Sequence, residues 1–355
     1  MTGLQALIDV ADTAALLRAV DGLCASRQWD ALADLGRRCL DAVELGKQLW
    51  PVATHIDYRL ALEAPPAHAA AVVRTGAGRF ALGPLTEVAA GSHDWAALSP
   101  HLPEAAAAAA VAQERVLRGE DLTAAATAGG AAGAGMALAA GDMPLRLAAW
   151  EPAYALPRYR DREAAFPQPE ASVRPLGGPR TLSPAAEDED DDAARALRGT
   201  VETWVAESSG RVATAAVRGS GAAAVGRLLL DTGRQPSAAF AVLGAGEALA
   251  VLQWAGASGG AYGRRRGGAA GRFSAWWAAT AVAGLDWPPD PGELGEAVGE
   301  GELGEAVGEL DWYRWSPPGA ETGWVLRLAV ADPLDGLAWA VEAVDQRDDE
   351  VPPAG

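Results

Sequence analysis

The sequence predicts an α+β protein with an all-helical N-terminal half and an α+β C-terminal half built on a small, mostly antiparallel sheet. Apolar residues follow a helical period early in the chain, whereas short alternating segments separated by helices of uneven length follow later. A proline-rich, acidic stretch separates the two patterns. We therefore expect a helical domain at 1–150, a linker at 151–195, an α+β domain at 196–348 and a disordered tail at 349–355.

The N-terminal half predicts a series of helices. Asp12 is placed to cap the first helix and Ser26 the second. The heptapeptides that begin at Ser26 and Ser92 echo each other 66 residues apart, about twice the period of helix-hairpin repeats. The sequence leaves open whether the helices form a repeat array or an irregular bundle. After the first two, helices are predicted at 52–64, 66–74, 84–90, 92–98 and 103–118.

The middle of the chain predicts little regular structure. Residues 123–140 are almost entirely Ala and Gly, which fits either a loop or a helix packed closely through its glycines. Beyond Trp150 the chain is rich in proline and reaches an acidic run, Glu187 to Asp192. Low hydrophobicity, many prolines and like charges are typical of an extended linker, so we assign 151–195 to a tether.

The C-terminal half opens with an ambiguous segment. Residues 200–207 and 211–218 alternate on either side of Ser208-Ser209-Gly210, which first indicates a β-hairpin. A helix that starts at Asp192 and runs through Leu197, Val201 and Trp204 competes with the first of these strands.

Later segments of this half are less ambiguous. We predict strands at 311–315 and 324–330, and helices at 221–230, 246–256, 272–285 and 333–344. Residues 292–300 and 301–309 form a perfect nine-residue duplication, GELGEAVGE, which fits a tolerant loop or helix and is a poor place for a functional site.

Composition excludes several classes of function. A net charge of −18 repels nucleic acid and anionic membranes at long range. The N-terminus lacks the basic region of a secretory signal, and no uncharged apolar run is long enough to span a membrane. Cys24 and Cys39 have no partner at metal-ligand spacing and are expected to be a reduced pair. These features predict a cytoplasmic protein.

No catalytic or cofactor motif is complete. Gly256-Ala-Ser-Gly-Gly260 matches a nucleophile elbow, but all four histidines precede its serine, whereas the elbow requires one that follows. The Gly219-Ser-Gly221 and Gly244-Ala-Gly246 turns lack the third glycine of a dinucleotide fingerprint, and no lysine completes a phosphate loop. No histidine pair has the spacing of a helical metal site. We therefore expect no cofactor and no metal.

One segment predicts a specific contact. Arg264, Arg265, Arg266 and Arg272 concentrate positive charge among glycines, just before a predicted helix whose N-terminal dipole would add to it. This pattern suits a phosphate, a carboxylate-bearing small molecule or an acidic partner surface. Alternatively, the arginines neutralise the chain's own carboxylates, such as the run at 187–192 or the duplicated glutamates.

The same region carries a family resemblance. The Gly-Arg-Arg-Arg-Gly-Gly core, the following Gly271-Arg-Phe-Ser-Ala-Trp-Trp277 and the later Gly323-Trp-Val-Leu-Arg-Leu328 resemble segments of uncharacterised proteins from high-GC actinobacteria. The resemblance covers the C-terminal half only. It implies lineage and a cytoplasmic location, and no activity.

Two functional hypotheses follow. The first is a non-enzymatic cytoplasmic recognition protein, whose helical half binds a protein partner and whose α+β half uses the arginine loop as a second recognition element. The second is an enzyme or small-molecule binder that holds an anionic substrate with these arginines and uses Asp286 or Glu247 as a base. Arginines that are already paired with internal acids would favour the first hypothesis.

Overall fold

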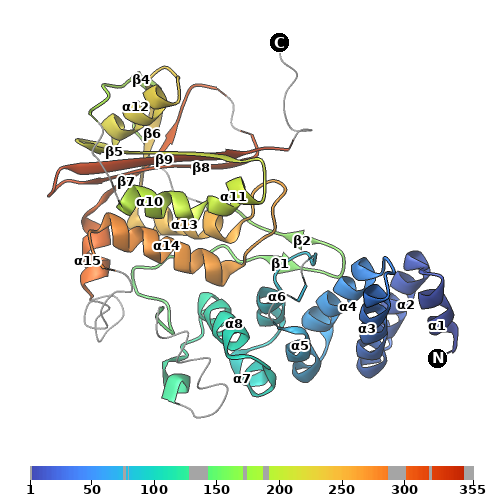
Figure 1. Cartoon of the computed structure of the whole chain (residues 1–355). Coiled ribbons are helices and arrows are strands. Elements are labelled where there is room, and N and C mark those ends of the chain that lie inside the picture. The colour runs from blue at the N-terminus through green and yellow to red at the C-terminus, as the bar shows by residue number, and fades with distance from the viewer. Residues whose placement is uncertain are drawn as a thin grey trace. The chain divides into compact units, whose positions relative to one another are not determined.

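The computed structural model describes residues 2–74, 77–78, 80–127, 143–170, 174–186, 192–286, 301–319 and 322–347. The chain divides into two compact units (Figure 1). Unit 1 contains residues 1–146 and 156–166, and unit 2 contains residues 147–155 and 167–355.

In the part that the structure describes, the regular elements of unit 1 are helices apart from one small hairpin. The predicted cap is confirmed at the first long helix, where the Asp12 carboxylate accepts a hydrogen bond of 2.9 Å from the Ala15 amide. Its elements are α1 (Thr2–Asp9), α2 (Thr13–Ala25), α3 (Trp29–Glu44), α4 (Trp50–Glu63), α5 (Pro66–Val72), α6 (Leu85–Ser92), α7 (Trp95–Leu98), η1 (Ser99–His101), α8 (Ala105–Leu117), η2 (Thr123–Thr127), β1 (Arg158–Tyr159) and β2 (Ala164–Ala165).

The helices of unit 1 pack in two sequential rows. Helices α2, α4, α6 and α8 each contact the next in one row, while α3 contacts α4 and α1, and α5 contacts α7. This neighbour-to-neighbour order is similar to that of a helical-repeat array, but the second row is interrupted where α3 and α5 make little contact. The two echoing heptapeptides lead into α3 and α7, which occupy equivalent places in the second row. The 66-residue interval therefore corresponds to two helix pairs.

Unit 2 is built on an antiparallel sheet of seven strands among the described residues. The sheet order is β3-β6-β7-β8-β9-β5, and β4 also pairs with β6. The strands are β3 (Arg174–Pro175), β4 (Arg180–Thr181), β5 (Arg211–Arg218), β6 (Ser237–Leu243), β7 (Asp311–Ser316), β8 (Trp324–Asp332) and β9 (Leu337–Asp345). The helices are α10 (Asp192–Thr200), α11 (Glu202–Ala206), α12 (Gly221–Asp231), α13 (Ala245–Ala257), α14 (Gly268–Val282) and α15 (Glu302–Glu309).

Helices cover both faces of this sheet (Figure 1). Helix α12 packs on β5, β8 and β9 from one side, while α10 and α13 lie on the other side with α14 against them. The core under α12 includes Leu228, Phe240 and Trp315. Because the central strands are buried on both faces, their side chains lack the apolar-polar alternation of a one-sided sheet.

This double burial explains one wrong prediction. Residues 333–344, predicted as an amphipathic helix, form a turn followed by strand β9. Every residue from Ala338 to Ala343 is buried, so the sequence carries no strand period. Gly336, with a φ of +66°, makes the turn that returns the chain beside β8.

The ambiguous segment is helical. Thr200 ends α10 and residues 202–206 form α11, so the strand first predicted at 200–207 is wrong and the competing helix is present. Leu197, Val201 and Trp204 are buried at helical spacing, and the Trp204 indole donates a hydrogen bond of 3.2 Å to the Ala255 carbonyl. The Ser208-Ser209-Gly210 turn then enters β5, whose partner is β9.

Other predictions are confirmed or fall outside the described residues. The predicted strands at 211–218, 311–315 and 324–330 and the helices at 221–230 and 246–256 are present, while the helix predicted from Arg272 starts at Gly268. Strand β6 was not predicted from the sequence. Helix α15 lies in the second copy of the duplication. Residues 128–142, 187–191, 292–300 and 349–355 lie outside the described residues.

The stretch 151–195, expected as a linker, contributes packed residues to both units. Tyr154 belongs to unit 2 and Tyr159 to unit 1, and Leu182 is part of the core under α12. Tyr154 and Leu182 are buried and Tyr159 is partly buried, so short parts of this otherwise polar stretch are held in place by packing.

Candidate functional site

An aromatic groove lies along one face of α4 in unit 1. Pro51, Thr54, His55 and Tyr58 line it at i, i+3, i+4 and i+7 spacing, which places them on one side of the helix. The groove has a volume of about 310 Å³, at the lower end of the range for ligand sites. The other lining residues are Leu17, Trp50, Phe80, Ala81, Leu82 and Arg162.

Large apolar side chains in this groove are unusually exposed. Trp50 is 41% exposed, Phe80 56% and Leu82 41%. The rings of Trp50 and Phe80 contact each other with centroids 4.4 Å apart and planes tilted by 48°. Exposed apolar groups that cluster, instead of being scattered singly, mark interaction sites.

His55 is the titratable group of the groove. Burial, followed by the positive charge of Arg59, lowers the pKa of its imidazole. The ring is stacked near that of Tyr58, with centroids 6.3 Å apart and planes inclined by 23°. The imidazole is therefore neutral at neutral pH, and Arg162 is the charged side chain among the residues that line the groove.

The hairpin of β1 and β2 fixes the wall beside α4. The Tyr58 hydroxyl donates a hydrogen bond to the Arg160 carbonyl oxygen. Arg162 pairs with Asp21 of α2, and Arg59 donates to the same carboxylate at 2.8 Å. Burial tends to raise the pKa of Asp21, but the two guanidinium groups lower it overall. These hydrogen bonds and ion pairs therefore join α2, α4 and the hairpin beside the groove.

A buried acid lies on the same helix. Asp57 is 9% exposed, and burial raises the pKa of its carboxyl to about 6. The nearest charged partner among the described residues is Arg74, whose guanidinium nitrogen is 3.9 Å from the carboxylate. This distance is at the limit of an ion pair and only partly offsets the cost of burial.

The structure separates the four predicted arginines. Arg264, Arg265 and Arg266 lie in the loop between α13 and α14, where Arg264 and Arg266 are exposed. The Arg264 Nε lies 3.8 Å from the Glu207 carboxylate. Arg272 instead points into the core of unit 2, where its side chain is fully buried. The four side chains thus do not converge on one site.

The buried Arg272 pairs with Glu151. Its Nε and Nη2 donate to the two carboxylate oxygens at 2.9 and 2.6 Å, and both side chains are fully buried. The Tyr154 hydroxyl and the Ala148 amide complete the carboxylate's hydrogen bonds. Burial alone would raise the pKa of Glu151, but the Arg272 charge lowers it overall. This pair anchors residues 147–155 to α14.

The arginine loop has a fixed backbone. The buried carboxylate of Asp345 accepts from the Ala261 amide at 2.6 Å, and the Ser208 hydroxyl accepts from the Tyr262 amide at 2.9 Å. A Cβ at Gly259 would lie 2.2 Å from the Arg264 carbonyl oxygen, so only glycine fits there. The loop thus presents Arg264 and Arg266 from a rigid frame.

Neither predicted base lies near the arginine loop. Glu247 accepts a hydrogen bond of 2.8 Å from the Gly244 amide and so helps to cap the start of α13. The arginine loop follows the other end of that helix, about ten residues or 15 Å away. Asp286 is exposed beyond the C-terminal end of α14, about 20 Å along the axis from Arg272. Neither acid can act on an anion held at these arginines in this conformation.

The comparison with protein families shows which family the chain belongs to. A model of a family of unknown function, DUF6183, matches residues 14–345. The chain belongs to this family. The match spans both units, whereas the resemblance noted from the sequence covered the C-terminal half only. No curated protein and no solved structure matches the chain.

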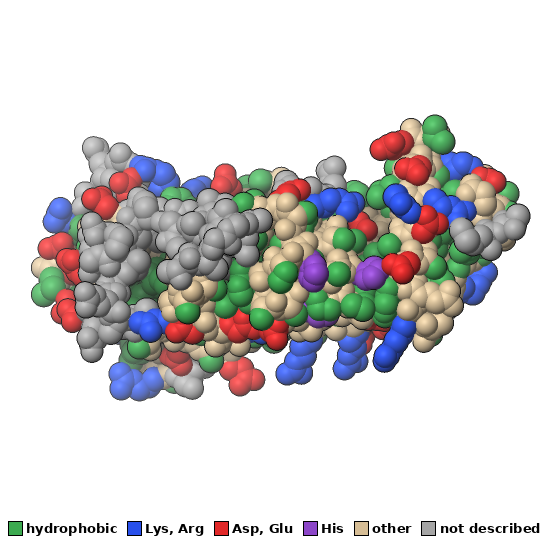
Figure 2. Space-filling view, turned by 90° about the horizontal axis from the view of Figure 1, so that it is seen from below, with side chains coloured by type: hydrophobic (Ala, Val, Ile, Leu, Met, Phe, Trp, Pro, Cys, Tyr) green, Lys and Arg blue, Asp and Glu red, His purple; other side chains and the backbone are tan. Residues whose placement is uncertain are grey.

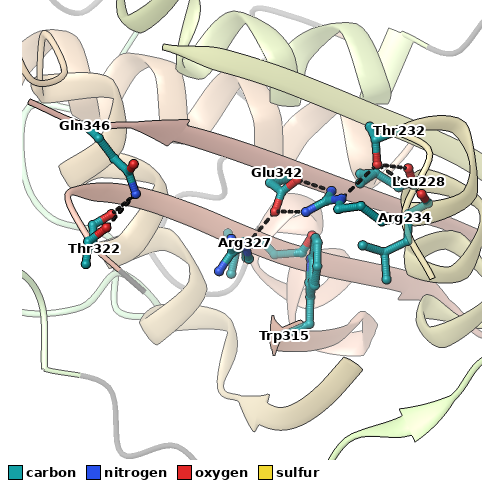
Figure 3. Close-up of polar contacts among 10 residues, drawn as sticks. Leu228, Thr232, Arg234, Trp315, Thr322, Arg327, Glu342 and Gln346 are labelled. Atoms are coloured by element: carbon teal, nitrogen blue, oxygen red, sulfur yellow. Dashed lines mark hydrogen bonds and ion pairs between the residues drawn. The ribbon is translucent and has the colours of Figure 1, made fainter. Parts of the chain in front are cut away.

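The sheet of this DUF6183 member carries a charged network beside α12 (Figure 3). Glu342 accepts from Arg234 at 3.0 Å and from Arg327 at 2.7 Å, and the Arg327 guanidinium lies over the Trp315 ring. Burial would raise the pKa of Glu342, but these hydrogen bonds lower it overall. The network ties β8 and β9 to the segment after α12, which makes it structural.

Figure 2 shows how side-chain types are distributed on one face of the DUF6183 chain. Over the helices of unit 1, histidines lie among hydrophobic, uncharged and some acidic side chains, and basic side chains project along the margin of this face. Within the described ranges, no group of three His, Cys, Asp or Glu side chains could hold a metal ion, and no helix is long and apolar enough to cross a membrane.

Sequence reasoning missed the groove. The sequence does not reveal that Trp50 and Phe80 are half-exposed, because it records hydrophobicity and not exposure. The available signal was the apolar segment at 80–82, which lies between two helices and outside any helical period.

Proposed function

We propose that the chain is a non-enzymatic cytoplasmic recognition protein, which binds a segment of a partner protein in the aromatic groove of unit 1. The observation that carries the proposal is the contact between the half-exposed Trp50 and Phe80 at the groove. Aromatic side chains at a shallow apolar hollow are typical anchors of protein interfaces. Helical-repeat arrays use their extended surfaces for such contacts.

The chemistry of the groove favours a protein segment with a large apolar anchor. The lining is mainly aromatic and aliphatic, His55 is kept neutral, and Arg162 is already paired with Asp21. A multiply charged metabolite would find no buried counter-charge here. Nucleic acid is disfavoured by the net charge of −18. The arginine-rich composition also supports an origin in high-GC actinobacteria.

A peptide selection tests this proposal. A phage-displayed library of random 12-residue peptides is selected on the intact chain, and the recovered peptides are titrated against Trp50→Ala and Phe80→Ala variants. We expect peptides with a large apolar residue, and a loss of affinity of at least tenfold in each variant, or about 1.4 kcal/mol. Phe273→Ala is the matched control, because Phe273 is 37% exposed but lies on α14 of unit 2.

Two results would contradict the proposal. One is a set of peptides whose affinity is unchanged by Trp50→Ala and Phe80→Ala. The other is a selection that recovers no peptide while indole or phenol binds at the groove, as detected by fluorine NMR of a fluorine-labelled Trp50. That second result would indicate a small-molecule site.

A second candidate is a small-molecule binder that holds an anion at the arginine loop. The rigid backbone under Arg264, Arg265 and Arg266 favours it, since preorganised donors lose little entropy on binding. A thermal-shift screen with phosphates, nucleotides and organic acids tests it. A ligand at 100 times its Kd should stabilise the chain by about 2.7 kcal/mol, and a triple Ala variant of these arginines should lose that shift.

A further inference from the structure

The aromatic groove of unit 1 contains polar groups that the fold itself does not use. Among the described residues, no hydrogen bond involves the Trp50 indole, the Thr54 hydroxyl or the His55 imidazole. Trp50 is 41% exposed, and no nitrogen or oxygen of Thr54 or His55 is among the buried atoms that lack a partner, so solvent reaches all three residues. An indole and a neutral imidazole each offer one N–H, and a hydroxyl can also donate. The groove therefore combines apolar rings with donors for the carbonyl groups of an occupant.

The backbone conformation of the occupant decides whether these donors are used. An α-helix commits its carbonyl groups to its own hydrogen bonds. A polyproline II helix has no internal hydrogen bonds, so its carbonyl groups remain available. A β-strand also leaves carbonyl groups available, but it binds by pairing with an open strand edge. None of the described residues that line the groove belongs to a strand, which favours the polyproline II helix.

The length of the groove fits one turn of that helix. From Pro51 to Tyr58 the groove follows α4 for about 10 Å, at a rise of about 1.5 Å per residue. Three residues of a polyproline II helix rise about 9 Å, so prolines at i and i+3 would reach both ends. The exposed Trp50 and Phe80 rings lie at one end, and the His55 ring, stacked near the buried Tyr58, lies toward the other.

The small size of the groove favours an occupant that is ordered before it binds. A hollow of about 310 Å³ contacts few side chains, so a flexible segment would lose much of its binding energy to the ordering of its backbone. A proline-rich segment already populates the polyproline II conformation, and aromatic-lined grooves are the sites that bind such segments. Arg162 is paired with Asp21, so no charge of opposite sign is required on the occupant.

We propose that the segment bound in the aromatic groove is proline-rich and forms a polyproline II helix, with prolines at i and i+3 on the aromatic rings. Its carbonyl groups accept hydrogen bonds from Trp50, Thr54 and His55. This inference rests on the proposed function, because it names the occupant of the same groove.

The test uses three 12-residue peptides and the intact chain. The first peptide has proline at every third position, which places all its prolines on one face of a polyproline II helix. The second has the same composition with proline at every second position, and the third is an amphipathic helix with Leu at i, i+3, i+4 and i+7. Fluorescence anisotropy gives the three affinities. We expect the first peptide to bind at least tenfold more tightly than the other two, and Trp50→Ala to weaken its binding at least tenfold.

Two variants that keep apolar bulk test the hydrogen bonds. Trp50→Phe and Thr54→Val each remove one donor, and an unchanged melting curve shows that each variant folds. Each should weaken binding of the first peptide by about three- to tenfold, the range expected for one hydrogen bond. Neither should weaken binding of the helical peptide.

The outcomes separate this inference from the proposed function. Tighter binding of the helical peptide, or equal binding of the two proline peptides, overturns the inference, but the proposed function stands if Trp50→Ala weakens that binding. Binding that Trp50→Ala leaves unchanged, or no binding at millimolar peptide, also overturns the inference, and the random library then decides the proposed function alone. A free chain that is a dimer in sedimentation and a monomer as Trp50→Ala overturns both, because a second copy would then occupy the groove.

Discussion

Breaking the Arg272–Glu151 pair gives the sharpest test of the packing in unit 2. Arg272→Met keeps the unbranched stem of the side chain but removes the guanidinium, and with it both hydrogen bonds to a carboxylate that is fully buried. Two donors remain on Glu151, from Tyr154 and Ala148. Removing one partner of a buried pair costs about 3–5 kcal/mol, because the other charge stays buried without compensation.

The assay is urea unfolding of the intact chain followed by circular dichroism, with hydrogen exchange to localise the loss to α14 and residues 147–155. At about 2–3 kcal/mol per molar urea, the midpoint should fall by about 1–2 M. The double variant Glu151→Leu with Arg272→Met should recover at least half of the lost stability, because it removes both buried charges. A loss below about 1 kcal/mol for Arg272→Met would refute the reasoning, as would additive losses in the double variant.

Three further predictions concern buried charge and backbone strain. Asp57 titrates near pH 6 when folded and near 3.8 when unfolded, so the native state binds its proton more tightly and stability falls as the pH rises between these values. Asp57→Asn should therefore gain up to about 3 kcal/mol at pH 7 and nothing below pH 3.8, as measured by urea unfolding; an equal gain at both pH values would contradict this. The pH dependence from Glu342 runs the other way: because its pKa is lowered in the folded state, it contributes stability above pH 4.5 that is lost as the pH falls through the folded pKa. Glu342→Gln should therefore reduce the fall of the melting temperature at acid pH, measured as melting temperature against pH. Gly260→Ala should lower the melting temperature, since its φ of +79° is unfavourable for alanine and the added Cβ would lie 2.2 Å from the Asp345 carboxylate; Gly233→Ala, with a φ of +73° and open space, is the control for the backbone term alone.

Local patterns predicted the fold where a helix or strand has one buried face. The Asp12 cap and the helices of unit 1 follow from the period of their apolar residues. The pattern failed at β9, where burial on both faces removes the period of two, and at β6, a seven-residue strand with similar composition. In both cases tertiary burial, which the local sequence does not record, decided the structure.

The partners of the buried charges were beyond local reasoning. Arg272 was grouped with Arg264 to Arg266 because they are close in sequence, yet its partner Glu151 is 121 residues away. Glu342 and Arg234 are 108 residues apart. The period of α14 offered one signal, because Arg272 lies one turn before Trp276 on its buried face.

The chain crosses between its two units three times within about twenty residues, at 146–147, 155–156 and 166–167. During synthesis, helix α6 emerges well before Tyr159, whose hydroxyl satisfies the buried Glu87. Unit 1 can therefore complete its core only after the ribosome has also delivered residues 147–155, which belong to unit 2. A gene rearrangement with a single breakpoint would leave one unit incomplete. The two units are thus expected to be inherited together, as a family match that runs from 14 to 345 indicates.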